Sequence, residues 1–470
     1  MGNEVKEKST RAIVAAVQLL GVSDVEFEAS VTELRELAKT LGFEVVRTFT
    51  QKRDNFDTTA YLGVGKRQEM RRFVENELEH APDSDSDPGG MRRAAKSGAA
   101  RAKEAAQSAA DPDTRHADIV LVDHEISPSQ ARNLEIEVGC EVMDRTMVIL
   151  EIFHRHARSR AARAQVEIAR LGYMAPRLRE AAKLAGPKGR QRSGTGGRGA
   201  GEAHSELDRQ KIRNRIAELK EEIDAMDVER KTQRARRQER QGLARVALVG
   251  YTNAGKSTLM RALTGSEVLV ADKLFATLDT TVRALYPESV PRVLVTDTVG
   301  FIKNLPHDLV ASFKSTLEEA VEASLLIHVI DASDPGFERQ IAVTDEVLRE
   351  IGAQAVPRIR VFNKIDCVGE AAAQRAREAA LRAQYPECMV MSARREADIA
   401  KLHAAIRAFF QKGLIEAEIF LPWSAQQLRG EIFSSCEVLE ERADGEGTFF
   451  RVRGESDTVN GLREQFGQAS

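Results

Sequence analysis

The chain has 470 residues, which is enough for about three domains with well-filled cores. It contains no run of about 18 apolar residues, and its first ten residues (MGNEVKEKST) lack the apolar centre of a secretory signal. We therefore expect a cytoplasmic protein without a membrane span and leave peripheral membrane association open. The four cysteines have neither metal-ligand nor redox spacing, which favours ordinary thiols.

The net charge of −3 hides an uneven distribution. Residues 155–240 contain 23 Lys and Arg against 12 Asp and Glu, a surplus of 11, which leaves −14 for the rest of the chain. A basic segment on an acidic protein indicates a surface for a polyanion. A solvated helix face is the alternative, but the surplus surrounds a glycine-rich stretch at residues 186–201, which weakens it.

The first 150 residues alternate between strand and helix patterns. The order is a strand at 12–17, a helix at 31–41, a strand at 43–48, a helix from about Lys66, a strand at 119–122, a helix from Ser127 and a short strand near Val142. This order predicts a small N-terminal α/β domain over residues 1–150. Residues 79–116 interrupt it with low-complexity sequence, which predicts a disordered insertion or a loose helix.

A Gly-x-Gly-Lys pattern precedes the second predicted helix, in residues 61–67 (YLGVGKR). It lacks full phosphate-loop spacing, so we expect a turn that leads into a helix N-terminus. Contact with an RNA phosphate is the alternative.

Residues 151–240 predict a basic helical hairpin. A long helical pattern runs from Asp144 through residue 171, and the glycines of residues 186–201 end helical structure because glycine is unfavourable there. A second helix has apolar residues at spacings of four and three, at Ile212, Ile216, Leu219, Ile223 and Met226. The tip between the helices combines glycine and arginine, which suits RNA phosphates and bases.

A phosphate loop, G-x-x-x-x-G-K-S, follows an apolar strand at 243–249 and precedes a helical pattern. Its residues are Gly250, Tyr251, Thr252, Asn253, Ala254, Gly255, Lys256 and Ser257. The glycines let consecutive backbone N–H groups face the β-phosphate. We expect Lys256 to act on the β- and γ-phosphates as a catalytic group, and Ser257 to ligate Mg²⁺.

The next strand pattern, at 293–296, ends in Asp297, Thr298, Val299 and Gly300. We expect Asp297 to hold Mg²⁺ through water, and the N–H of Gly300 to contact the γ-phosphate as a second catalytic group. Phe301 follows, where Ras-like proteins have the glutamine that orients the attacking water. Phenylalanine cannot do this, so the intrinsic rate should be low.

Two further loops predict specificity for guanine. The strand at 360–362 leads into Asn363, Lys364, Ile365 and Asp366, and the strand at 388–391 leads into Ser392, Ala393 and Arg394. The Asp366 carboxylate can accept both N–H groups on the guanine edge, which adenine does not offer. Backbone N–H groups of the second loop would meet the guanine O6. Four motifs in this order predict a domain at 241–413 that hydrolyses GTP to GDP and phosphate.

Residues 414–470 form a separate unit with a β-α-β-β-α pattern. It carries no catalytic constellation. The predicted fold class is therefore α/β, with a P-loop GTPase domain between the N-terminal α/β domain with its hairpin and a small C-terminal α+β domain.

Nearly the whole chain outside the insertion resembles the HflX family of ribosome-associated GTPases. The matching stretches include TQKRDNFDTTAYLGVGK, LVDHEISPSQARNLE, VMDRTMVILEIFHRHARSR, GTGGRGAGEAHSELDRQKIRNRI, GYTNAGKSTLMRALTG and DTVGFIKNLPHDLVASFKSTLEE. The resemblance implies that the chain binds the large ribosomal subunit and its RNA, and splits or rescues stalled ribosomes. It also implies a hairpin tip near the ribosome's RNA active centre and a C-terminal domain that serves in docking.

The resemblance also assigns the first switch segment. That segment comprises Phe275, Ala276, Thr277, Leu278 and Asp279. The resemblance makes Thr277 a Mg²⁺ ligand and a catalytic residue, whereas the residues alone leave Thr280 and Thr281 as rivals. Related GTPases use an asparagine at the position of Asn253 to hold K⁺, and a brace for the loop is the open alternative.

The leading hypothesis is a monomeric, Mg²⁺-dependent GTPase that acts on stalled ribosomes through the large subunit. Two alternatives stay open. One is a checkpoint GTPase that acts on precursor subunits during ribosome assembly. The other is a GTP-gated RNA-binding switch without useful turnover.

Overall fold

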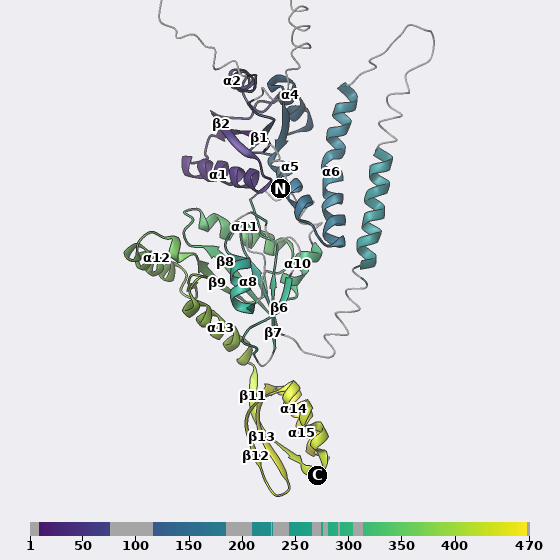
Figure 1. Ribbon diagram of the computed structural model, residues 1–470, viewed down its shortest axis with the longest axis vertical. Helices are drawn as coiled ribbons and strands as arrows, with labels where there is room; N and C mark the ends of the chain where they lie inside the picture. Colours follow the sequence, from purple (N-terminus) through teal and green to yellow (C-terminus); the bar gives the residue numbers. More distant parts are fainter. Residues whose placement is uncertain are drawn as a thin grey trace, which may run out of the picture. The chain divides into compact units, whose positions relative to one another are not determined.

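The computed structural model describes residues 9–75, 116–184, 209–226, 228, 244–265, 274–275, 281–289, 292–303 and 314–467. The chain divides into two compact units. The first comprises Met1–Arg155 and Val166–Lys220, and the second comprises His156–Gln165 and Glu221–Ser470. Figure 1 follows their elements along the sequence.

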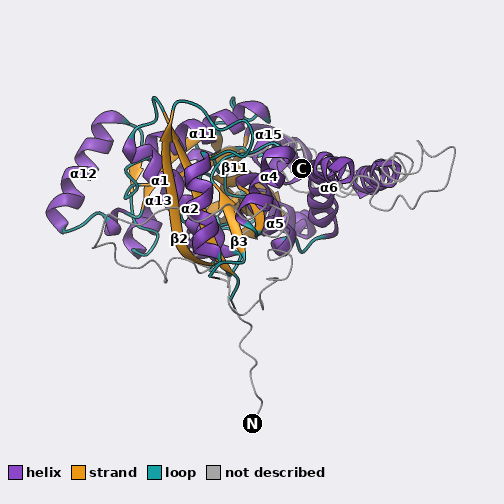
Figure 2. Cartoon of the chain, turned by 90° about the horizontal axis from the view of Figure 1, so that it is seen from above, coloured by secondary structure: helices purple, strands orange, loops and turns teal. Residues whose placement is uncertain are grey.

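The first unit is built on a parallel sheet in the order β2-β1-β3-β4. Its strands are β1 (Arg11–Leu19), β2 (Glu44–Arg53), β3 (Ile119–Val122) and β4 (Glu141–Asp144), and its helices include α1 (Asp24–Thr40), α2 (Val64–Val74) and α4 (Pro128–Val138). Strands β1 and β3 are buried almost throughout, as expected for a parallel sheet covered on both faces. Figure 2 shows α1 and α2 against this sheet. The predicted α/β fold is confirmed; the insertion lies almost wholly outside the described residues.

The predicted long helix from Asp144 is wrong in one respect, because the chain forms two helices, α5 (Arg145–His156) and α6 (Arg160–Leu184). The hydroxyl of Ser159 accepts a hydrogen bond from the Ala162 N–H at 3.1 Å. This is the contact of a helix N-cap, and it explains why the second helix starts here.

Helix α6 is fastened to the parallel sheet by the buried carboxylate of Asp144, at the end of β4. Arg177 donates to it at 2.6 Å, and the Tyr173 hydroxyl donates to the same oxygen. The backbone N–H groups of Ile126 and Met147 also donate to this carboxylate. A buried charge needs such partners, so this cluster fixes the direction of α6 on the sheet.

Residues 209–226 form the second helix of the hairpin, as the apolar stripe predicts. Leu219 of the stripe is buried, and the other four residues are half-buried. The two helices run antiparallel, because Glu167 pairs with Arg215 at 2.9 Å and Arg160 pairs with Glu222. The glycine-rich tip lies outside the described residues.

The second unit contains a six-stranded sheet in the order β10-β9-β8-β5-β7-β6. Its strands are β5 (Ala244–Val249), β6 (Thr281–Ala284), β7 (Val293–Asp297), β8 (Leu325–Asp331), β9 (Arg358–Asn363) and β10 (Met389–Val390). Its helices are α8 (Lys256–Thr264), α10 (Lys314–Val321), α11 (Phe337–Glu350), α12 (Ala371–Gln384) and α13 (Glu396–Gln411). Only β6 is antiparallel, so the carboxyl ends of the other five strands meet at one edge.

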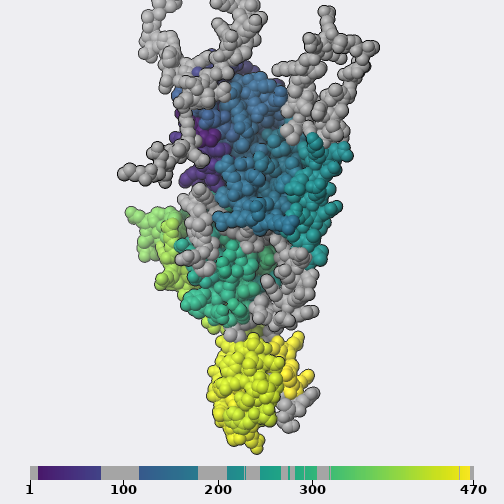
Figure 3. Space-filling view, turned by 45° about the vertical axis from the view of Figure 1, so that its right-hand side comes forward, coloured from purple at the N-terminus to yellow at the C-terminus, as the bar shows by residue number. Residues whose placement is uncertain are grey.

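The C-terminal residues form an antiparallel sheet in the order β11-β13-β12. The elements are β11 (Leu414–Pro422), α14 (Arg429–Ser435), β12 (Glu437–Ala443), β13 (Gly447–Glu455) and α15 (Ser456–Gly467). They share a hydrophobic core and make one continuous body, coloured yellow in Figure 3. The predicted β-α-β-β-α order is confirmed. Within the described part of the chain, no helix is long and apolar enough to cross a membrane.

Candidate nucleotide site

The phosphate loop leaves the centre of the six-stranded sheet, since β5 lies between β8 and β7 and α8 begins at Lys256. Both of its glycines are required by geometry. Gly250 has φ +145°, and a Cβ placed there would lie 2.2 Å from the carbonyl oxygen of Val329. Gly255 has φ +97°, and its Cβ would lie 2.3 Å from Nδ2 of Asn363. No other residue fits either position without moving the backbone.

The Lys256 ammonium is enclosed by its own loop. Its Nζ donates to the carbonyl oxygens of Gly250 at 3.0 Å and Tyr251 at 2.8 Å, and the residue is 7% exposed. Burial lowers the pKa of Lys256 to about 8, although the nearby Asp297 carboxylate acts in the opposite direction. The loop is thus curled around the ammonium group of Lys256.

Two predicted magnesium-site residues are in direct contact. The Ser257 hydroxyl donates to the Asp297 carboxylate at 2.7 Å, and Asp297 is fully buried at the end of β7. Next to it, the Thr298 hydroxyl donates to the Leu248 carbonyl at 2.7 Å and joins β7 to β5. A hydroxyl and a carboxylate are hard oxygen donors, so this set fits Mg²⁺.

The first switch segment is described only in part. Phe275 is buried, with φ +56°. Ala276, Thr277, Leu278 and Asp279 lie outside the described residues, so the role of Thr277 stays a prediction.

Gly300 and Phe301 pack against the phosphate loop. A Cβ on Gly300 would lie 2.9 Å from Cα of Thr252 and 3.0 Å from Nζ of Lys256, so glycine is required for this approach. The Thr252 N–H donates to the Phe301 carbonyl at 2.7 Å, and the Phe301 N–H donates to the Gly250 carbonyl at 3.1 Å. The Phe301 side chain is 1% exposed and belongs to the interior. The motifs gave no indication of this backbone pairing.

The Asn363 side chain joins three loops. Its Nδ2 donates to the carbonyl of Ala254 in the phosphate loop at 2.9 Å, and its Oδ1 accepts from the N–H of Ala393 at 2.9 Å. Lys364 has φ +61° and pairs with Asp331 at 2.9 Å. The predicted phosphate and guanine motifs are therefore brought to one place.

The loops predicted to bind guanine contact two residues that the sequence motifs did not identify. Asp331, at the end of β8, holds Lys364, and Asp398 accepts the Ser392 N–H at 3.1 Å. Asp331 could have been predicted from the sequence, because it is a polar residue at the end of an apolar strand pattern. The Arg394 guanidinium lies 3.8 Å from the Asp366 carboxylate.

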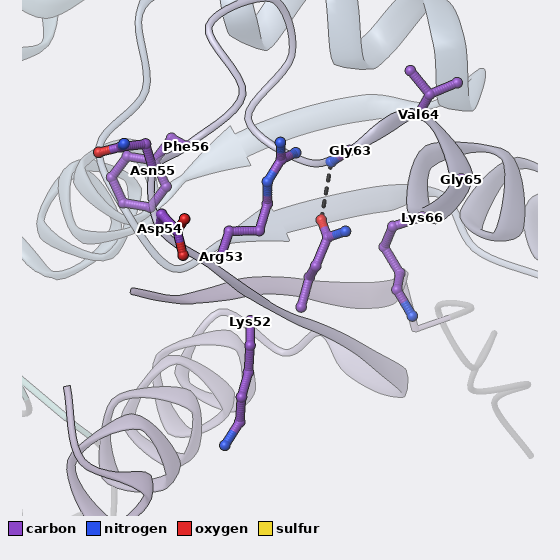
Figure 4. A pocket seen from close by; sticks show the side chains of 10 residues that line it. Lys52, Arg53, Asp54, Asn55, Phe56, Gly63, Val64, Gly65 and Lys66 are labelled. Carbon is purple, nitrogen blue, oxygen red and sulfur yellow. Dashed lines mark hydrogen bonds between the residues drawn. The ribbon is translucent and has the colours of Figure 1, made fainter. Parts of the chain in front are cut away.

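The Gly-x-Gly-Lys pattern belongs to the first unit, whereas these motifs belong to the second. Gly63 directly precedes α2, as predicted, and donates its N–H to the Gln51 side chain at 2.9 Å (Figure 4). It lines a pocket of about 600 Å³ between the end of β2 and the first turn of α2. The pocket's lysines have acidic partners, since Lys52 pairs with Asp24 and Lys66 pairs with Glu69, both at 2.8 Å.

A phosphate loop at the centre of a mostly parallel sheet, with a hydroxyl–aspartate pair and an Asn-Lys-x-Asp loop beside it, defines a P-loop GTPase domain. A family model described as "50S ribosome-binding GTPase" matches residues 245–364. Models described as "GTP-binding GTPase Middle Region" and "GTP-binding GTPase N-terminal" match residues 156–237, and residues 28–81 and 91–154.

The relatives are more specific than the class. "GTPase HflX" of Gluconacetobacter diazotrophicus is 51% identical over 454 residues, which cover 96% of each chain. "GTPase HflX" of Escherichia coli is 39% identical over 333 residues, or 71% of this chain and 76% of that protein. The chain therefore belongs to the HflX family of GTPases, and it hydrolyses GTP.

A GTP-binding protein of Sulfolobus solfataricus, solved in complex with GDP, aligns over 84% of this chain and 99% of its own. It is 22% identical, with a TM-score of 0.42.

The buried Lys256 makes nucleotide affinity depend on pH. Nucleotide phosphates favour the charged lysine and raise its pKa above the value of about 8 in the free protein, so binding takes up a proton in alkaline solution. GDP affinity should fall about tenfold between pH 7 and 9 as the free lysine loses its proton. Fluorescence titration with labelled GDP measures this. Calorimetry at about pH 8.5 in two buffers of different ionisation enthalpy checks the proton uptake. A GDP affinity that stays constant from about pH 7 to 9 would contradict this prediction.

Asp366→Asn should change the base preference of the site from guanine to xanthine. The amide offers a donor where the carboxylate accepts, so GTP affinity should fall about a hundredfold or more, while xanthosine triphosphate gains. Competition binding of the two nucleotides gives both values. Tight binding of the xanthine nucleotide is also the control for folding. An unchanged preference for GTP would remove Asp366 from the base site.

Proposed function

We propose that this GTPase binds the large ribosomal subunit in its GTP-bound form and splits or rescues stalled ribosomes. The observation that supports this most is that one chain combines the phosphate and guanine loops of a GTPase with a basic helical hairpin. The alignments with the two relatives named above cover 96% and 71% of this chain. The family model that matches the GTPase domain is described as ribosome-binding. Four parts carry this function: residues 1–150, 151–240, 241–413 and 414–470.

Within the nucleotide site, each contact supports one role. Lys256 and the loop N–H groups bind the β- and γ-phosphates, and Gly300 contributes an N–H to the γ-phosphate. Ser257 and Thr277 hold Mg²⁺, with Asp297 acting through water, and the ion neutralises charge on the phosphates. Asp366 reads the guanine edge, and the loop of Ser392, Ala393 and Arg394 meets its O6.

The hairpin is proposed as the RNA-contacting part. Between its helices, Arg215 and Arg160 are paired with glutamates, so part of the positive charge holds the hairpin together. Each such pair is neutral and uses none of the surplus of 11 positive charges in residues 155–240. Three arginines of the glycine-rich tip, Arg190, Arg192 and Arg198, are therefore assigned to RNA phosphates.

Two other functions remain as alternatives. A checkpoint on precursor subunits would use the same hairpin on immature RNA. A GTP-gated RNA-binding switch is favoured by one observation, the buried Phe301 side chain, which leaves the usual water-orienting position without a polar group.

Replacing Arg190, Arg192 and Arg198 with Ala should weaken binding to the large subunit while GTP affinity stays unchanged. Each lost phosphate contact lowers the slope of log affinity against log salt by roughly one unit. Sedimentation at several salt concentrations measures binding, and the release of subunits from stalled ribosomes measures splitting. The matched control replaces Arg349, Arg375 and Arg382, which are exposed on α11 and α12. If the tip variant splits ribosomes like its parent, the tip is only a linker.

We also propose that K⁺ binds beside the phosphates at Asn253. This residue is exposed with φ +56°, and its side chain has no hydrogen-bond partner among the described residues, which favours an ion over a brace. GTP turnover should be faster in K⁺ than in Na⁺ at equal ionic strength, and Asn253→Ala should remove the difference. Equal rates for the unaltered chain in the two salts would contradict the proposal.

A further inference from the structure

GTP hydrolysis needs a group that orients the attacking water, and residue 301 cannot supply it. The Phe301 side chain is 1% exposed. Its backbone is held on both sides, by Thr252 N–H at 2.7 Å and by the Gly250 carbonyl at 3.1 Å. Whichever way its ring turns, phenylalanine presents no polar atom to the water. The group must come from elsewhere.

Among the described residues, the phosphate loop contributes three hydroxyls and Thr298 after β7 contributes a fourth, and three of the four are engaged. The Tyr251 hydroxyl accepts the Lys303 N–H at 2.8 Å. The Ser257 hydroxyl donates to Asp297, and the Thr298 hydroxyl donates to a strand carbonyl, both at 2.7 Å. The Tyr251 hydroxyl thus stabilises the loop, the Ser257 hydroxyl is placed as a metal ligand, and the Thr298 hydroxyl connects two strands.

The fourth hydroxyl belongs to Thr252, and it is different. The residue is 6% exposed, and its Oγ1 is buried without a hydrogen-bond partner among the described residues. Buried hydroxyls nearly always have a partner, and an unmade bond is unfavourable. An isolated hydroxyl in a phosphate loop therefore points to a partner that arrives with the substrate.

The surroundings of Thr252 indicate which partner that is. A Cβ built on Gly300 would lie 2.9 Å from both Cα and Cγ2 of Thr252, and 3.0 Å from Nζ of Lys256. Thr252, Gly300 and the lysine that serves the γ-phosphate therefore meet at one point. The backbone of Thr252 is fixed at this place through its N–H, which donates to the Phe301 carbonyl.

We propose that Thr252 is a catalytic residue whose hydroxyl hydrogen-bonds the attacking water at the γ-phosphate, in the role that Phe301 cannot fill. The water oxygen forms a bond to the γ-phosphorus, and the bond from phosphorus to the β–γ bridging oxygen breaks. Its electron pair stays on GDP, and the proton of the water goes to the phosphate product. Thr252 gains and loses no proton. The inference depends on GTP hydrolysis alone and not on any action on ribosomes.

The test compares the full chain with Thr252→Val, which keeps the shape, and Thr252→Ser, which keeps the hydroxyl. Single-turnover hydrolysis is measured beside the affinities for GDP and for a non-hydrolysable GTP analogue. Thr252→Val should hydrolyse GTP about tenfold more slowly, with both affinities within about twofold of the parent, and Thr252→Ser should retain the rate. Thr344→Val is the matched control, because it removes a buried hydroxyl from α11 of the same domain.

Three results would overturn the proposal: an unchanged rate in Thr252→Val, a loss of affinity equal to the loss of rate, or a Thr252→Ser variant as slow as Thr252→Val. Thr252→Ala is the second hydroxyl-free variant. It decides the question if the valine does not fold, since it leaves the loop with space rather than strain, and it must give the same slow hydrolysis with unchanged affinity.

Discussion

The nucleotide site depends on one side chain, the amide of Asn363. It donates to Ala254 in the phosphate loop and accepts from Ala393 in the loop after β10, each at 2.9 Å. Asn363 is 2% exposed, so both bonds are shielded from water. Hydrogen bonds in the protein interior are stronger than in water, and their loss there is more costly. These two bonds fix the distance between the phosphate loop and the loop after β10, so the predicted nucleotide site is preorganised.

The same packing that shapes the phosphate loop keeps the side chain of residue 301 out of the chemistry. Gly300 and Phe301 are held against the phosphate loop by backbone bonds, and the phenylalanine ring is in the core. This stabilises the loop but provides no polar side chain for water at that position. Slow turnover by the chain itself is therefore expected.

Sequence analysis predicted those features that are carried by short segments. The strand before Gly250, the two glycines and the helix at Lys256 are one local unit, and each is where the motif places it. The break between α5 and α6 was missed, although Ser159 is a usual helix-capping residue, because the helical pattern continues on both sides of it.

Other features could not be predicted because they join distant residues. Asn363 reaches a carbonyl 109 positions away, and no local pattern specifies that contact. Likewise, the Thr252 hydroxyl has no hydrogen-bond partner among the described residues because of the groups that surround it in the folded domain, and a local sequence pattern does not specify those groups.

The central claim is that this chain hydrolyses GTP slowly by itself and completes the reaction on mature large ribosomal subunits. The direct measurement is its steady-state GTP turnover without ribosomal particles, with mature large subunits and with precursor subunits, at equal salt and saturating GTP. The account predicts low turnover by itself and a strong increase that is greatest with mature subunits. Turnover that is equal in all three conditions, or raised by precursors alone, would contradict it.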